Sequence, residues 1–224
     1  MQHLHLYTQK RSGRLCFILL ILSCLIAGCF TSGKPQYNVE KYLLSYPASS
    51  WNQLDKLPAS VKLNRFSIAS VYNSTSMIFR NDEYSVDSFN YSRWAVNPAD
   101  MIGDSLLTDL RASGLFETVL SRQETDEGRF IISGGIEEFY LKMDKSPKTA
   151  LIRISITMQD SEAKETGKRM MFQKKYIREE PLQDPSPRGY SQAASGAMQA
   201  VSREIIGDIY QAVKATVQPA KSSP

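Results

Sequence analysis

Cysteine and histidine, the side chains behind most nucleophilic and metal chemistry in proteins, are confined to the N-terminal end of this chain. The histidines are His3 and His5, and the cysteines are Cys16, Cys24 and Cys29. If this end is a targeting segment that is removed, the remaining protein has no imidazole, and any thiol is at its own N-terminus. Such a protein has no Ser/His/Asp or Cys/His catalytic site, no internal disulfide and no zinc site built from cysteine and histidine.

Carboxylates are the remaining candidates for acid–base chemistry. Three pairs of adjacent acidic residues occur, namely Asp82-Glu83, Glu137-Glu138 and Glu179-Glu180. A glycoside hydrolase places two carboxyl groups about 5 to 9.5 Å apart across a sugar. Adjacent residues of a strand point to opposite faces, and acidic residues in turns are generally solvated, so we expect these pairs to be structural. We therefore predict a protein without catalytic residues, metal or cofactor. An enzyme with a carboxylate-based site is the alternative.

The first 28 residues resemble a bacterial lipoprotein signal. A basic stretch, Met1–Arg14, precedes an apolar run, Leu15–Gly28, which is shorter than the about 20 residues that a transmembrane helix needs. The run ends in Leu25-Ile26-Ala27-Gly28-Cys29, which resembles a lipobox. We predict a signal peptide over residues 1–28, acylation of Cys29 with fatty acids such as palmitate, and a tether over 29–36. A plain signal peptide and an uncleaved anchor are the other interpretations.

The composition indicates a folded domain of nearly neutral charge. The chain has 224 residues, of which 42% are apolar and 22% charged, and its formal net charge is +4. Three basic residues lie in the predicted signal, so the rest carries 24 basic and 23 acidic side chains. Because nucleic-acid surfaces need clustered positive charge, we expect no nucleic-acid partner. Since no linker or repeat interrupts the remainder, we predict one domain over residues 37–217 and a disordered tail over 218–224.

Two amphipathic helices are predicted. For the first, Asn97 is a favourable N-cap, Pro98 suits the first helical position, and Gly114 suits a left-handed C-cap. The second begins near Tyr190 or Ser191 and ends before Pro219. Its apolar stripe consists of Ala194, Ala197, Met198, Val201, Ile205, Ile209 and Ala212.

Strands are predicted before, between and after these turns and helices. Their expected positions are residues 38–45, 63–71, 77–80, 84–86, 116–120, 130–132, 136–141, 150–158 and 168–178. Segments 77–80 and 84–86 form a hairpin, and Gly134-Gly135 predict a bulge or bend. Apolar and polar residues alternate over 150–158, which is typical of a half-buried strand. The pattern predicts an α+β fold: a two-layer sandwich with a mainly antiparallel or mixed sheet and two amphipathic helices.

The order of several short motifs resembles a known family. After the lipobox, these are Leu63-Asn64-Arg65-Phe66, Met77-Ile78-Phe79-Arg80, Tyr84 with Val86-Asp87, Arg93-Trp94, the helix at Pro98, and Ser113-Gly114-Leu115-Phe116. In this order they resemble the ABC-type transport auxiliary lipoproteins over nearly the whole mature chain. The resemblance implies a non-catalytic periplasmic component that accompanies an ABC transporter permease and ATPase and a mammalian-cell-entry (MCE) domain protein. The implied task is transport of phospholipid or another lipid across the Gram-negative envelope. Only Cys29 is carried over as a functional residue.

An aromatic-rich stretch precedes the first helix. Tyr84, Phe89, Tyr91 and Trp94 either form a small core under a loop or make a contact surface. The partner would be the transporter or another copy of this chain, because tyrosine and tryptophan combine large contact area with a polar group. A lipid-anchored periplasmic enzyme and a structural envelope lipoprotein without a transport role are the alternative functions.

The residue after Cys29 predicts the membrane. In lipoproteins that this one resembles, an acidic residue at that position favours retention at the inner membrane. Here the position is Phe30, and the first acidic residue is Glu40. We therefore predict attachment to the outer membrane, facing the periplasm. The seven residues Phe30–Gln36 reach at most about 25 Å, so the domain is expected to lie close to its membrane.

Overall fold

The computed structural model describes residues 37–144, 146–165, 167 and 169–218. Cys29, the predicted signal and tether, and nearly all of the predicted tail lie outside these residues. By its contacts the chain divides into a unit Met1–Asn38 and a compact unit Val39–Pro224. The described residues of the second unit form an α+β fold with a nine-stranded sheet.

The strands in chain order are β1 (Glu40–Tyr42), β2 (Leu57–Leu63), β3 (Ser67–Ile68), β4 (Ser76–Arg80), β5 (Asp87–Trp94), β6 (Phe116–Ser121), β7 (Phe130–Lys142), β8 (Thr149–Asp160) and β9 (Met170–Pro181). The helices are η1 (Ser70–Tyr72), a single 3-10 turn, α2 (Pro98–Ser113) and α3 (Pro187–Val217).

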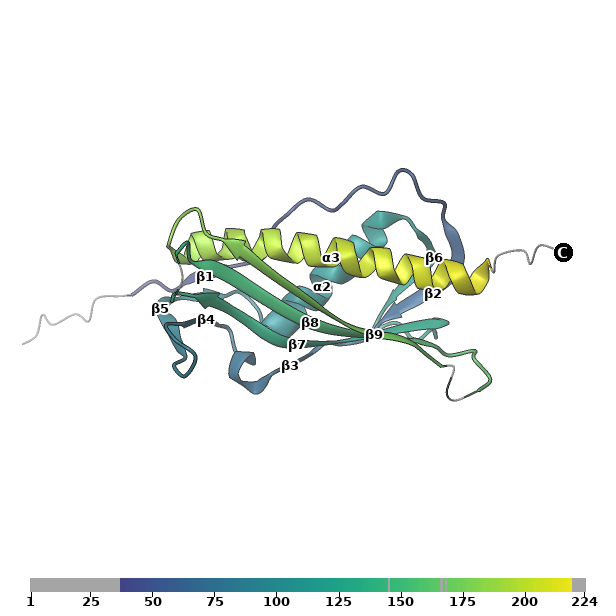
Figure 1. Ribbon diagram of the computed structural model, residues 1–224, viewed down its shortest axis with the longest axis horizontal. Coiled ribbons are helices and arrows are strands. Elements are labelled where there is room, and N and C mark those ends of the chain that lie inside the picture. Colours follow the sequence, from purple (N-terminus) through teal and green to yellow (C-terminus); the bar gives the residue numbers. More distant parts are fainter. Residues whose placement is uncertain (1–36, 145, 166, 168, 219–224) are drawn as a thin grey trace, which may run out of the picture. The chain divides into compact units, whose positions relative to one another are not determined.

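The long strand β7 organises the sheet (Figure 1). Along one edge it pairs antiparallel with β8, from Phe130 opposite Asp160 to Lys142 opposite Thr149, and β8 pairs antiparallel with β9. Along the other edge it pairs in parallel with β2, β3 and β4 in turn. Strand β6 follows β2, while β5 and β1 follow β4. The sheet is therefore mixed, which is one of the two arrangements that the sequence predicts. On this side of β7 it divides into two arms, one formed by β2 and β6 and the other by β4, β5 and β1.

Both helices pack on the face of the sheet that carries the main core. Helix α3 contacts β8, β9 and β2, and α2 contacts β6, β3 and β7 (Figure 1). The predicted alternation in β8 is confirmed, because its inward residues are fully buried: Ala150, Ile152, Ile154, Ile156 and Met158. The predicted stripe of α3 is buried against them except for Ala212, which is only partly buried. This is the expected two-layer α+β sandwich.

A second, smaller apolar cluster covers part of the opposite sheet face. It contains Tyr72, Ile78, Tyr140 and Leu151. Tyr140 lies between Phe139 and Leu141 in β7, both of which belong to the main core. Since side chains alternate along a strand, Tyr140 points to the other face. Its ring stacks on that of Tyr72 at a centroid distance of 6.0 Å.

The predicted caps of α2 are confirmed. The side chain of Asn97 accepts a hydrogen bond from the backbone N–H of Ala99 at 2.9 Å, and Gly114 has φ 65°. Helix α3 begins at Pro187, three residues before the predicted start at Tyr190, with Ser186 as N-cap. Pro187 occupies the first helical position, where a missing N–H costs no hydrogen bond.

Two predicted strands are placed differently. The predicted strand 63–71 is wrong, since β2 ends at Leu63 and only Ser67–Ile68 pair again before η1. This stretch carries the chain along β7 from β2 toward β4. The hairpin of β4 and β5 is confirmed, but its second strand begins at Asp87, so residues 84–86 lie in the turn.

The predicted bulge at the glycine pair is also displaced. Gly134 and Gly135 stay in register with Ile156 and Ser155 of β8, and Glu137 is the residue that the ladder skips. Gly134 instead makes room for the ring of Phe66. A Cβ atom at this position would lie 2.4 Å from two ring carbons.

Candidate functional site

The paired carboxylates of the strands are engaged in ion pairs. Glu137 pairs with Lys175 at 3.0 Å, and Glu138 pairs with Arg153 at 3.0 Å. Glu179 pairs with Lys142 on β7, while Glu180 pairs with Arg178 at 3.6 Å. Except for that last pair, the partners belong to different strands. The three pairs that join different strands therefore tie the sheet together.

The remaining pair, Asp82-Glu83, lies in the turn between β4 and β5. The Asp82 carboxylate accepts hydrogen bonds from the backbone N–H groups of Tyr84 and Ser85, both at 2.7 Å. These two bonds hold the pKa of Asp82 below its ordinary value, with the bond from Tyr84 contributing most. A carboxylate that is stabilised as an anion in this way is a poor general acid.

Neither metal clusters nor spanning helices occur in the part of the chain that the structure describes. No group of three or more His, Cys, Asp or Glu side chains there is placed to hold a metal ion. Within the same residues, no helix is long and apolar enough to cross a membrane.

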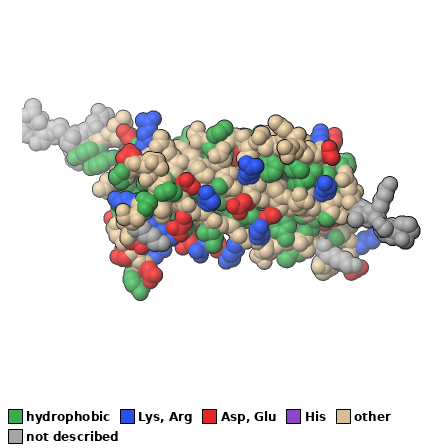
Figure 2. Space-filling model, turned by 45° about the horizontal axis from the view of Figure 1, so that its top comes forward, with side chains coloured by type: hydrophobic (Ala, Val, Ile, Leu, Met, Phe, Trp, Pro, Cys, Tyr) green, Lys and Arg blue, Asp and Glu red, His purple; other side chains and the backbone are tan. Residues whose placement is uncertain are grey.

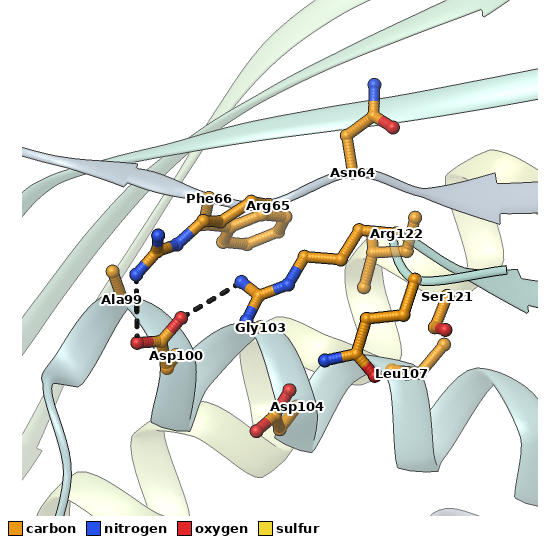
Figure 3. A pocket seen from close by; sticks show the side chains of 12 residues that line it. Asn64, Arg65, Phe66, Ala99, Asp100, Gly103, Asp104, Leu107, Ser121 and Arg122 are labelled. Atoms are coloured by element: carbon orange, nitrogen blue, oxygen red, sulfur yellow. Dashed lines mark hydrogen bonds and ion pairs between the residues drawn. The ribbon is translucent and has the colours of Figure 1, made fainter.

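A small pocket lies between α2 and the link from β2 to β3 (Figure 3). Asp100, in the first turn of α2, accepts hydrogen bonds from Arg65 at 3.1 Å and from Arg122 at 3.0 Å. The guanidinium of Arg122, and then that of Arg65, hold the pKa of Asp100 below its usual range despite partial desolvation. Asp104 also lines the pocket, so two acidic and two basic side chains balance. Its volume is only about 70 Å³. The ion pairs of Asp100 with Arg65 and Arg122 fasten α2 to the sheet.

A larger groove lies between the segment after β1 and helix α2. Its volume is about 490 Å³, and Leu43 and Val96, 54% and 43% exposed, lie at its edge. Buried Asp109 accepts hydrogen bonds from the phenol of Tyr46 at 3.0 Å and from the hydroxyl of Ser202. Burial, followed by the nearby Asp109 charge, raises the pKa of Tyr46. The groove thus has apolar residues at its edge and the carboxylate of Asp109 at its base. That carboxylate is already hydrogen-bonded to Tyr46 and Ser202.

The segment from residue 43 to 55, which we call the strap, runs along one ridge of α3. Ser191 donates a hydrogen bond to the carbonyl of Leu43 at 2.8 Å, and the N–H of Ser45 donates to the hydroxyl of Ser195 at 3.0 Å. Further along, Gln199 donates to the carbonyl of Pro47, Arg203 lies over the ring of Trp51, and Tyr210 donates to the carbonyl of Asp55. Residues four apart share one face of a helix, which is why these side chains reach one segment.

The sequence reasoning missed the strap. The usable signal was the run Ser191, Ser195, Gln199 and Arg203, which places a polar residue at every fourth position along one ridge of this amphipathic helix. A row of polar side chains along a helix indicates that this side of the helix faces either solvent or another segment whose backbone groups it can bind.

The four aromatic residues before α2 separate into two groups. Trp94 is 1% exposed and packs on Phe139, with ring centroids 5.1 Å apart. Phe89 is partly buried against Phe79. Both therefore belong to the core rather than to a contact surface. Tyr84 and Tyr91 are 94% and 48% exposed and remain candidates for such a surface. Cys29 lies outside the described residues.

Comparisons with known proteins agree on family and fold. The model of a family described as the ABC-type transport auxiliary lipoprotein component matches residues 42–206. No curated protein matches the chain. The crystal structure of protein XCC0632 from Xanthomonas campestris superposes with a TM-score of 0.71 at 15% identity, covering 79% of this chain and 98% of that one. A crystal structure of an uncharacterized protein gives a TM-score of 0.58 at 10% identity, covering 73% and 99%. At these identities the structural likeness concerns the fold alone.

Proposed function

The chain belongs to the ABC-type transport auxiliary lipoprotein component family, and from this we propose that it is a lipid-anchored, non-catalytic component of an ABC transport system. The observation that carries the proposal is the family match, which spans residues 42–206 and so covers most of the folded unit. The fold supports it, because the ionisable pairs that could suggest catalysis are tied into the sheet by ion pairs.

The transport system that we propose moves phospholipid or another lipid between the membranes of a Gram-negative envelope. The proposed partners are the permease and ATPase of the transporter and an MCE-domain protein. In this arrangement the domain stands in the periplasm, on a tether attached to the outer membrane, and connects the transporter to that membrane.

The anchor is tested by replacing the proposed lipid-bearing residue. We expect Cys29→Ala to abolish labelling by radioactive palmitate and to leave an uncut precursor, because acylation precedes signal cleavage in lipoproteins. Ser23→Ala, a change within the signal that leaves the lipobox intact, is the matched control and should be labelled normally. Palmitate labelling of the Cys29→Ala protein at the wild-type level would refute the anchor.

The choice of membrane is tested by separating inner and outer membranes on a density gradient. We expect the wild-type protein in the outer-membrane fraction and a Phe30→Asp variant in the inner-membrane fraction. Phe30→Ser should stay with the outer membrane, since it removes the aromatic ring without adding charge. Recovery of the wild-type protein mainly with the inner membrane would contradict the proposed location.

The absence of catalysis is tested directly on the purified protein. We expect no hydrolysis of ester, peptide or glycan substrates, because no histidine follows His5 and no cysteine follows Cys29. Reproducible turnover that disappears when one carboxylate is replaced by its amide would favour the alternative of a lipid-anchored enzyme.

A further inference from the structure

The turn that joins β4 to β5 presents apolar side chains to solvent. We call residues 81–86 the hairpin tip. Within it Tyr84 is 94% exposed and Val86 is 47% exposed. In Figure 2 hydrophobic and acidic side chains project together at the lower left, where Figure 1 places this hairpin. The turn therefore offers one aromatic and one aliphatic side chain to any surface that it meets, and a tyrosine there combines apolar contact area with a polar group.

The hairpin tip is held in one shape by its own hydrogen bonds. The carboxylate of Asp82 binds the N–H groups of Tyr84 and Ser85, each at 2.7 Å. The guanidinium of Arg80 donates to the backbone carbonyl of Glu83. An aspartate that closes a turn in this way orders the backbone before any partner is present. The exposure of Tyr84 therefore follows from the conformation of the turn, which these hydrogen bonds hold.

The strand pairing shows from which side the chain enters the domain. Strand β1 runs parallel to β5, with Glu40 opposite Ser92 and Tyr42 opposite Trp94. Strand β5 leaves the hairpin tip at Asp87, so β1 begins, at Glu40, with its first residue toward the side of the tip. The step from Ser92 back to Asp87 spans about 17 Å. The ten residues from Phe30 to Val39 reach at most about 36 Å.

We propose that the hairpin tip contacts the surface of the phospholipid bilayer that holds the Cys29 lipid. This inference rests on the lipid anchor of the proposed function. The chain enters β1 on the side of the domain where the tip lies, and the step from Ser92 to Asp87 is about half of the reach of ten extended residues. Tyrosine rings favour the headgroup region of bilayers, where the ring is partly buried and the hydroxyl stays wet.

The charges near the tip fit zwitterionic headgroups rather than anionic ones. Residues 80–87 carry one basic side chain, Arg80, and three acidic ones, Asp82, Glu83 and Asp87. An anionic bilayer would repel this surface, whereas phosphatidylethanolamine would not. One tyrosine and one valine bind a membrane weakly on their own. A neighbouring lipid anchor keeps them at high local concentration, so a weak contact is sufficient to fix the orientation of the domain.

The experiment uses the full-length lipidated protein in phosphatidylethanolamine-rich vesicles. An environment-sensitive fluorophore is attached to a cysteine introduced by Val86→Cys in one variant and by Glu127→Cys in another. Glu127 is exposed and lies before the start of β7, about 40 Å along that strand from the end that pairs with β4. We expect a blue shift and a several-fold rise in fluorescence at position 86 on reconstitution, and no change at position 127.

Two further variants distinguish a membrane contact from an unrelated change. Tyr84→Ser in the Val86→Cys background should remove most of the fluorescence rise. Met170→Ser, which removes an exposed apolar side chain at the far end of the sheet, should leave it unchanged. Vesicles made mainly of phosphatidylglycerol should give a smaller rise at position 86.

The outcomes separate this inference from the proposed anchor. Protein that floats with the vesicles while position 86 stays as aqueous as position 127 overturns the membrane contact and leaves the anchor standing. Protein that does not float with the vesicles overturns both. A rise at position 86 that is indifferent to Tyr84→Ser also contradicts the contact as described.

Discussion

The ring of Phe66 occupies the space above Gly134 that a side chain at residue 134 would need. A Cβ atom on Gly134 would lie 2.4 Å from the ring, and Gly103 of α2 lies on the other side, with its Cβ position 3.9 Å from the same ring. Phe66 is 4% exposed and is thus held between the sheet and α2. Phe66 belongs to the link from β2 to β3, and Gly134 belongs to β7, with which both strands pair. The contact between Phe66 and Gly134 therefore holds the link against β7.

The first prediction concerns that close approach. Gly134→Ala should lower the free energy of unfolding by about 1–3 kcal/mol, since the added methyl group overpacks the site and the backbone holds both residues. Urea unfolding followed by circular dichroism measures the change. Gly167→Ala is the control, because nothing lies within 4 Å of that Cβ position. In a Phe66→Leu background the cost of Gly134→Ala should shrink, and an unchanged cost would show that the ring is not the cause.

A second prediction addresses the base of the groove. Ser202 is 2% exposed, and its hydroxyl donates to the buried carboxylate of Asp109. Ser202→Ala should lower the free energy of unfolding by about 1.5–3 kcal/mol, because the carboxylate loses one of its two hydroxyl donors. Tyr46→Phe should have a similar effect. The double variant should deviate from the sum of the two single variants, since both donors serve one oxygen. Strict additivity would argue against a shared acceptor.

The pH dependence of stability should reveal the pair of Arg129 and Asp160. Arg129 donates to both carboxylate oxygens, at 3.0 and 2.9 Å, and holds the pKa of Asp160 below its ordinary value. The unfolded chain, in which the Asp160 pKa is about 3.9, therefore takes up a proton before the folded chain does. The stabilisation is complete above about pH 5 and is lost as the pH falls through the folded pKa.

Arg129→Gln tests this assignment. The variant should be less stable than the wild type at neutral pH, and the difference should shrink as the pH falls below about 4. Urea unfolding at a series of pH values measures both curves. A difference that stays constant from neutral pH down to about pH 3 would mean that Arg129 acts through packing and not through the charge of Asp160.

The fourth prediction concerns the strap on α3. The N–H of Ser45 donates to the hydroxyl of Ser195, so Ser195→Ala removes its acceptor. We expect faster hydrogen exchange at the Ser45 amide, by about three- to tenfold, which corresponds to a net hydrogen bond of about 0.5–1.5 kcal/mol. Amides in β8 should exchange at the wild-type rate. Equal acceleration in β8 would indicate global destabilisation instead of release of the strap.

The sequence predicted the elements whose signals are local. Asn97 and Gly114 bound α2 because their cap chemistry involves only neighbouring residues. The alternation in β8 shows one buried face without reference to any partner strand. The predictions of these elements were correct because each depends only on residues that are close together in the sequence.

The misplaced elements depend on contacts between distant segments. Strand β2, Leu57–Leu63, was not among the predicted strands, although its burial alternates along its length. Its pairing with β6 is irregular between Leu57 and Ser60, beside Pro58, which lacks an N–H. Gly134 suggested a bulge, whereas its partner is Phe66, 68 residues earlier in the sequence. Trp94 could not be assigned to core or surface until Phe139 was placed beside it. The strap was missed because its backbone groups are satisfied by α3.

The central claim is that this lipoprotein works with an ABC transporter, and co-purification from native envelopes tests it most directly. The full chain with a C-terminal affinity tag should be solubilised in mild detergent, and the proteins that accompany it should be identified by mass spectrometry. We expect the transporter permease, its ATPase and an MCE-domain protein, in amounts reduced severalfold for the Cys29→Ala variant, which lacks the acyl chains. Recovery of the intact, lipidated protein without any ABC transporter subunit, before and after chemical cross-linking, would contradict the account.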